Sequence, residues 1–125
     1  MIPDVVTKTL ARVQFQACIR RSTALMIASQ EGHVEVVRLL LACQAVDVNK
    51  ADSNGFTALC IASYTGHVEV VRLLLAHPGV KTRQTTSDGW SALGAASQSG
   101  HGAIVSLLVA HRAKEQVRLL AAIRP

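Results

Sequence analysis

The apolar positions of the chain follow a helical rhythm that glycine interrupts at regular intervals. After Gly32, apolar residues stand at i, i+3, i+6 and i+7, which places them on one face of a helix: Val34, Val37, Leu40 and Leu41. The letters GHVEVVRLLLA that begin at Gly32 return unchanged from Gly66. Because an apolar face must be covered, the pattern predicts two equivalent helices that pack against neighbouring elements.

The whole rhythm returns after 34 residues. Three sets of positions share this spacing, namely Thr23, Thr57 and Ser91; Gly32, Gly66 and Gly100; and His33, His67 and His101. A fixed period of this length is typical of solenoids, in which stacked units bury faces that no unit can bury alone. We therefore expect a core that runs continuously from unit to unit.

The second unit predicts its own local structure. Asn54-Gly55 is typical of a hairpin turn, because both residues tolerate a positive φ. Thr57 then stands at the N-cap of a short helix of small residues, which Gly66 ends in the left-handed conformation. A second helix follows and ends before Pro78. We expect the two helices to lie back to back, with the hairpin projecting sideways.

From Asp52 to Leu75 the sequence reads D-x-x-G-x-T-A-L-x-x-A-S-x-x-G-H-V-E-V-V-x-L-L-L. This pattern resembles an ankyrin repeat, and the resemblance covers residues 22–111 as three units of 22–51, 52–85 and 86–111. It implies an all-α solenoid of stacked helix-turn-helix units joined by short β-hairpin loops. It also implies a protein–protein interaction module, or scaffold, with no chemistry of its own.

The sequence departs from the family pattern at one motif. The family's T-P-L-H appears here as TALM, TALC and SALG, so Met26, Cys60 and Gly94 replace a histidine that in the family resembles a brace between repeats. We expect weaker coupling between units as a result. Unit one also has Arg21 where Gly55 and Gly89 stand in the later hairpins.

The two ends of the chain are expected to cap the stack. Residues 1–21 predict an irregular N-terminal cap, or an extra helix. Residues 112–125 predict a C-terminal capping helix, because no glycine ends the second helix of the third unit. An apolar stripe on this helix is expected to cover the last repeat, and it consists of Val117, Leu120, Ala121 and Ile123.

The positive charge lies mainly at the ends. The net charge is +5, and both residues 1–21 and residues 81–125 carry a basic excess. Basic groups cluster at Arg20 and Arg21, at Lys81 and Arg83, and at Arg112, Lys114 and Arg118. Aromatic residues are mostly separate from these cations, unlike in grooves for single-stranded nucleic acid. Nucleic acid is therefore disfavoured as a partner, but a basic adaptor that binds acidic partners or nucleic acid through its charged termini is the second hypothesis.

The histidines do not predict a metal site. His33, His67 and His101 would form a ladder with the helix spacing of about 8–10 Å, whereas zinc ligands lie about 2 Å from the metal. We interpret each as setting the start of a second helix. His77 and His111 follow helix ends in the predicted pattern and are expected to be solvated.

Catalytic and cofactor motifs are not found. Ser91 fills the N-cap position that Thr57 fills in unit two, and Gly89-x-Ser91-x-x-Gly94 is not a nucleophile elbow. We expect no enzyme, no cofactor and no metal. Cys18, Cys43 and Cys60 show no ligand spacing and are expected to be reduced. No apolar run approaches the roughly twenty residues that span a bilayer, so we expect no membrane partner and a cytoplasmic, or nuclear, monomer.

The resemblance places partner contacts on the hairpin tips and the concave face of the first helices. Phe56 and Trp90 occupy equivalent positions there, and aromatic side chains are common interface anchors. In unit one the matching positions are Arg21, Ser22, Gln30 and Glu31. The predicted protein-interaction residues are Ser53, Asn54, Phe56, Tyr64, Thr65, Asp88, Trp90, Gln98 and Ser99. A third hypothesis is a degenerate repeat fragment without a partner.

Overall fold

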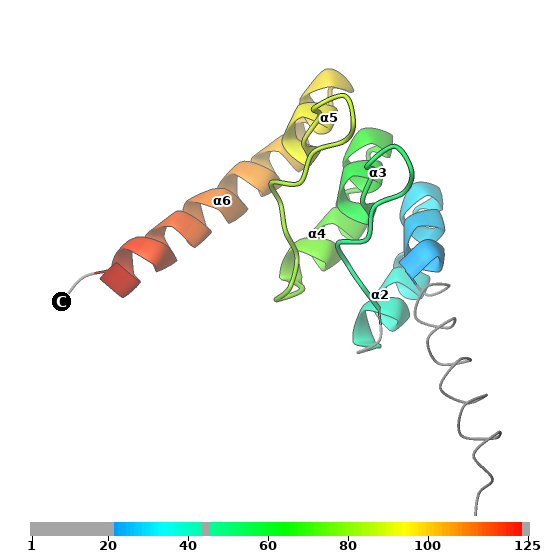
Figure 1. Cartoon of the computed structure of the whole chain (residues 1–125), viewed down its shortest axis with the longest axis horizontal. Coiled ribbons are helices and arrows are strands. Elements are labelled where there is room, and N and C mark those ends of the chain that lie inside the picture. Colours follow the sequence, from blue (N-terminus) through cyan, green and yellow to red (C-terminus); the bar gives the residue numbers. More distant parts are fainter. Residues whose placement is uncertain (1–21, 44–45, 124–125) are drawn as a thin grey trace, which may run out of the picture.

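The computed structural model describes residues 22–43 and 46–123, which form a stack of helix pairs (Figure 1). In chain order the helical segments are 22–31, Val34–Ala42 (α2), Ala58–Thr65 (α3), Val68–Ala76 (α4), Ala92–Gln98 (α5) and Gly102–Ile123 (α6). In each pair the chain reverses at a glycine, and neighbouring pairs lie side by side. The predicted all-α solenoid is confirmed. The cap expected over residues 1–21 lies outside the described residues.

The first helices begin and end where the sequence predicts. The Thr57 hydroxyl oxygen accepts from the Cys60 N–H at 3.3 Å, and the Ser91 hydroxyl oxygen accepts from the Gly94 N–H at 3.1 Å. Each bond satisfies one of the backbone donors that a helix leaves free at its first turn. Gly66 ends α3 with a φ of 90°, a conformation that costs other residues more than glycine.

The core runs through all three units. Val37, Val71 and Leu74, from the predicted apolar faces of α2 and α4, are fully buried. Val70 is fully buried as well, although the single predicted stripe did not include it. Ile104 occupies the same position in α6 and is also buried. An interior second helix therefore has two covered sides, because α4 packs against both α2 and α6.

The connections between pairs are hairpin turns with almost no regular strand. Among the described residues the structure has one isolated antiparallel bridge, between Thr85 and Ser91. In the first turn, Asp52 accepts the N–H groups of Asn54 and Phe56 on one carboxylate oxygen, both at 2.9 Å. Gly55 takes a φ of 82° at this turn, as the Asn-Gly pair predicted. These turns carry the residues expected to contact a partner.

The C-terminal helix does not cover the last repeat as expected. α6 is one continuous helix of 22 residues, and its distal half extends away from the stack (Figure 1). Val117 is 65% exposed and Ile123 is 77% exposed, so the predicted apolar stripe faces solvent. The prediction was wrong because capping needs a turn that folds the chain back, and a helix without glycine or proline simply continues.

Candidate protein-interaction surface

The hairpins and first helices of units two and three enclose a shallow hollow of about 360 Å³. α3 and α5 pack against each other and form its floor, and the two hairpins form its sides. Phe56 is half-buried, whereas Tyr64 and Trp90 are exposed. The lining residues are Phe56, Tyr64, Asp88, Trp90, Ala95 and Gln98. Three of the four aromatic residues of the chain therefore meet at one place.

Trp90 is held by the hairpin and by the helix that follows it. The Trp90 N–H donates to the Thr86 hydroxyl oxygen at 3.1 Å, and the Thr86 N–H donates to the Trp90 carbonyl at 2.8 Å. A Cβ atom at Gly94 would lie 3.1 Å from Cε3 of the indole ring. The small residue at Gly94, which replaces the family's histidine, thus gives the indole its place.

The two hairpins are joined at their tips. The Ser87 N–H donates to the Asn54 carbonyl oxygen at 2.9 Å. A Cβ atom at Gly55 would come within 2.9 Å of the Ser87 nitrogen, so the turn accepts only glycine without a shift. This contact fixes the spacing of the hairpins and, with it, the distance between Phe56 and Trp90.

The structure gathers five of the nine predicted contact residues around the hollow, namely Phe56, Tyr64, Asp88, Trp90 and Gln98. Ser53 and Asn54 are exposed at the hairpin tip outside it, and Ser99 is half-buried at the end of α5. Thr65 is exposed, but its hydroxyl donates to the Ile61 carbonyl at 2.8 Å. Ala95 lines the hollow and was missed, because an alanine in a series of small helix residues indicates close packing rather than a site.

One expected contact position in unit one is buried. Ser22 is 1% exposed, and its hydroxyl oxygen accepts from the Asp47 N–H at 3.0 Å. Ser22 lies within the helical segment 22–31, so it cannot belong to an exposed hairpin. Gln30 and Glu31 are exposed as expected, and Arg21 lies outside the described residues.

Two of the repeated histidines connect successive units. His67 Nε2 lies 2.8 Å from the Gln30 carbonyl oxygen, and His101 Nε2 lies 3.1 Å from the Tyr64 carbonyl oxygen. Since a carbonyl can only accept, each ring nitrogen donates. His67 also stands at the N-cap of α4, as predicted, but its side chain makes no capping bond there. The bond from His101 fixes the backbone of Tyr64 at the hollow.

The expectation for His77 and His111 was wrong. His77 is half-buried, and its Nδ1 accepts from the Gly79 N–H at 3.1 Å. His111 lies inside α6 rather than after a helix end, and its Nδ1 is 3.9 Å from a Glu115 carboxylate oxygen. The continuation of α6 is the physical reason for the second difference.

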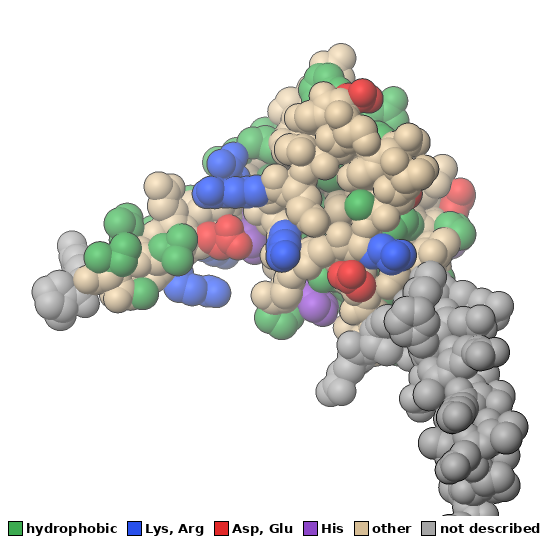
Figure 2. All heavy atoms as spheres, viewed as in Figure 1, with side chains coloured by type: hydrophobic (Ala, Val, Ile, Leu, Met, Phe, Trp, Pro, Cys, Tyr) green, Lys and Arg blue, Asp and Glu red, His purple; other side chains and the backbone are tan. Residues whose placement is uncertain are grey.

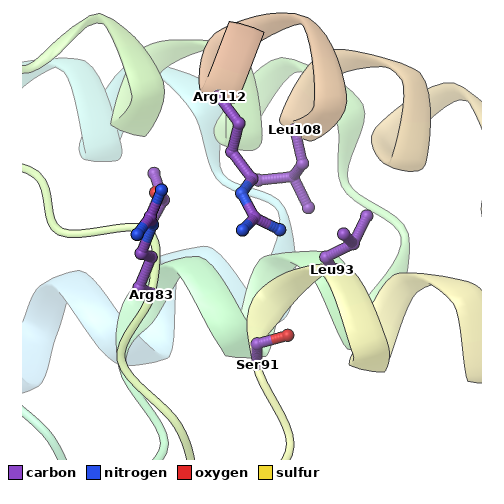
Figure 3. Close-up of a pocket in the computed structure, with 6 residues that line it drawn as sticks. Arg83, Ser91, Leu93, Leu108 and Arg112 are labelled. Atoms are coloured by element: carbon purple, nitrogen blue, oxygen red, sulfur yellow. The ribbon is translucent and has the colours of Figure 1, made fainter. Parts of the chain in front are cut away.

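The predicted basic clusters at residues 81–83 and 112–118 lie near each other. Arg83 and Arg112 line one hollow of about 230 Å³, where Figure 3 shows Arg112 projecting from α6 near Leu93 and Leu108. Glu115 lines the adjoining grooves beside Arg83 and Arg118. On the face shown in Figure 2, Lys and Arg side chains form separate groups with acidic side chains between them. The positive charge is therefore local and partly offset.

Comparison with known families agrees with this architecture. The family model for ankyrin repeats (3 copies) matches residues 3–86 and again residues 46–120. The chain belongs to the ankyrin-repeat family. Ankyrin repeats are non-catalytic modules that generally mediate protein–protein interaction. No curated protein matches the sequence of this ankyrin-repeat chain.

Two further findings concern only the described part of this ankyrin-repeat protein. No three or more His, Cys, Asp or Glu side chains in it are grouped so that they could hold a metal ion. None of its helices is both long enough and apolar enough to cross a bilayer.

Proposed function

We propose that this ankyrin-repeat protein binds a protein partner in the hollow between the hairpins of units two and three. The observation that carries the proposal is the exposure of two aromatic rings beside one concave surface: Tyr64 is 57% exposed and Trp90 is 42% exposed. Large aromatic side chains at the centre of an interface supply much of its binding energy. Exposed rings that line a hollow are therefore suited to receive an apolar side chain of a partner.

The rim of the hollow is polar. Asp88 and Gln98 line it on the side of unit three, and both are exposed. A carboxylate and an amide accept hydrogen bonds, so the preferred partner segment carries a donor or a basic group next to its apolar anchor. A polar rim around apolar anchors is the usual arrangement of a specific protein interface.

The hollow is held rigid before any partner binds. The Tyr64 backbone is held by His101, the Trp90 backbone by Thr86, and the hairpin tips by the bond between Ser87 and Asn54. A surface that is already ordered loses less conformational entropy on binding. This arrangement favours recognition by a fixed surface over folding upon binding.

The test uses the single tryptophan of the chain as both variant and reporter. Proteins captured by the wild-type chain are compared with those captured by Trp90→Ala, Tyr64→Ala and the control Val117→Ala, which removes an exposed apolar side chain on α6. A partner of the hollow is lost with the first two variants and kept with the third. With that partner purified, Trp90→Ala lowers affinity by at least about tenfold, and binding changes the Trp90 emission of the wild type. A folded Trp90→Ala variant with full affinity for every captured protein contradicts the proposal and favours a repeat fragment without a partner at this site.

A second candidate function is supported by the meeting of Arg83 and Arg112 in one hollow. We propose it as a contact for an acidic partner at the C-terminal side of the stack. The variant pair Arg83→Glu and Arg112→Glu tests it, together with the salt dependence of binding. Contacts with phosphates weaken steeply with ionic strength, whereas binding at the aromatic hollow is expected to change little.

A further inference from the structure

The first face of the helix stack is exposed at positions that are buried inside the stack. Val36 of α2 is 45% exposed, whereas its equivalents Val70 and Ile104 are fully buried. Leu39, one turn along α2, is 69% exposed. Nothing in the chemistry of these positions differs between units, so the difference comes from the missing neighbour. We call this surface the N-face, and it consists of Ile27, Val36 and Leu39.

The opposite face of the stack shows the complementary pattern. Ser97 of α5 is exposed, whereas its equivalents Ser29 and Ser63 are fully buried. Val109 of α6 is 51% exposed, although Leu75 at the same position of α4 is packed against the core. We call this surface the C-face, and it consists of Leu93, Ser97, Val105 and Val109.

Inside the chain, the side of each unit that corresponds to the N-face rests on the preceding unit. α4 packs on α2, and α6 packs on α4. At each of these junctions a histidine ring lies over a glycine: a Cβ atom at Gly32 would come within 2.6 Å of the His67 ring, and one at Gly66 would come within 2.6 Å of the His101 ring. The chain therefore contains two examples of how an N-face is covered.

The components of a third junction are present but separated at the two ends. His33 is exposed, and a Cβ atom at Gly100 would meet nothing within 4 Å. Gln98 stands 34 residues after Tyr64, whose carbonyl oxygen accepts from His101 at the preceding junction. The C-face thus offers an open glycine and a carbonyl at the positions that receive a histidine elsewhere.

We propose that a second copy of this chain stacks head to tail on the first, with its N-face on the C-face of the first copy. In this arrangement His33 of the second copy lies over Gly100 and donates to the Gln98 carbonyl. The occupant is another copy because the contact continues an interface that the chain already makes twice. The contact joins two different surfaces, so it leaves a free face at each end and allows further copies to add. This replaces the monomer expected from the sequence, and it does not depend on the aromatic hollow.

The test measures the mass of the intact chain in solution against concentration. Sedimentation and light scattering from about 1 μM to about 500 μM, a range that covers weak association, are expected to show a mass that rises above the 13.3 kDa monomer. Leu39→Glu blocks the N-face and Val109→Glu blocks the C-face, and each weakens association by at least about tenfold. Ala42→Glu and Ala110→Glu are matched controls on the same helices, because this alanine position is exposed in every unit.

Mixing the two face variants tests the head-to-tail geometry itself. Each variant keeps one intact face, so an equal mixture is expected to form a dimer of one copy of each and to stop there. A mixture that stays monomeric overturns the proposal, as does association of the Glu variants at the strength of their controls. A wild type that is monomeric at the highest concentration also overturns it. If the α2 amides around Leu39 are then protected from hydrogen exchange, the N-face is covered by the chain's own residues 1–21.

Discussion

His67 Nε2 lies 2.8 Å from the carbonyl oxygen of Gln30, in the preceding unit of the stack. The same bond joins His101 to Tyr64 at the next junction. The family motif that supplies a brace between repeats is lost in all three units, and coupling was expected to be weak for that reason. The structure places a different histidine between the units.

We predict that His67→Ala lowers the free energy of unfolding by about 1–2 kcal/mol, because it leaves the Gln30 carbonyl without its donor and removes the ring from Gly32. Urea denaturation at low protein concentration measures this loss. His33→Ala is the matched control, since His33 has the same sequence context but is exposed. A loss of the same size in His33→Ala would show that the junction is not the cause.

Gly55→Ala is predicted to destabilise the protein more than Gly89→Ala. Both glycines have a positive φ, 82° and 84°, and both variants bear the cost of that conformation, about 1–2 kcal/mol. A Cβ atom at Gly55 also meets the Ser87 nitrogen at 2.9 Å, whereas nothing lies within 4 Å at Gly89. We expect an additional loss of about 1 kcal/mol or more in Gly55→Ala, measured by chemical denaturation. Equal losses would mean that the hairpin tips are not held together as the structure shows.

Ser63→Ala is predicted to stabilise the protein. Ser63 is fully buried between units, and its hydroxyl has no hydrogen-bond partner. Removal of a buried hydroxyl without a partner relieves a desolvation cost of about 1 kcal/mol, and alanine also has the higher helix propensity. Ser97→Ala, at the exposed equivalent position, gains only the propensity term, about 0.5 kcal/mol. Thermal unfolding of both variants compares them, and a larger gain in Ser97→Ala would contradict this interpretation.

Substitutions on the distal half of α6 are predicted to have little effect on stability. Leu120 is 60% exposed, so Leu120→Ser is expected to change the free energy of unfolding by less than about 0.5 kcal/mol. Leu108→Ala, in the buried half of the same helix, is expected to cost about 2–5 kcal/mol. Equilibrium denaturation distinguishes the two. A cost above about 1 kcal/mol for Leu120→Ser would indicate that the distal helix covers the last repeat after all.

The sequence predicted those features that depend on local chemistry and on the 34-residue period. The caps at Thr57 and Ser91, the end of α3 at Gly66 and the apolar face with Val37 and Val71 all leave marks in the side-chain pattern. A strict period also makes equivalent residues neighbours, which is why Phe56 and Trp90 were predicted on one side of the stack. The fold could therefore be predicted from the sequence almost completely.

The features that were missed depend on the offset between neighbouring units. The partner of His67 is a backbone carbonyl, and a carbonyl leaves no trace in a pattern of side chains. Val70 is buried by a second neighbour, so a stripe on one helix could not include it. The seat of Trp90 required the knowledge that the indole faces Gly94, where the sequence showed only a lost histidine.

The junction between His67 and Gly32 also determines how the chain can be shortened. Excision of 34 residues, from 52 to 85, removes one hairpin and one helix pair and brings His101 into the place that His67 now holds. The ring then lies over Gly32, and its Nε2 meets the Gln30 carbonyl as before. A deletion of 33 or 35 residues shifts every later apolar position by about 100° around its helix. The protein therefore tolerates loss of length in one increment, the distance between two histidines.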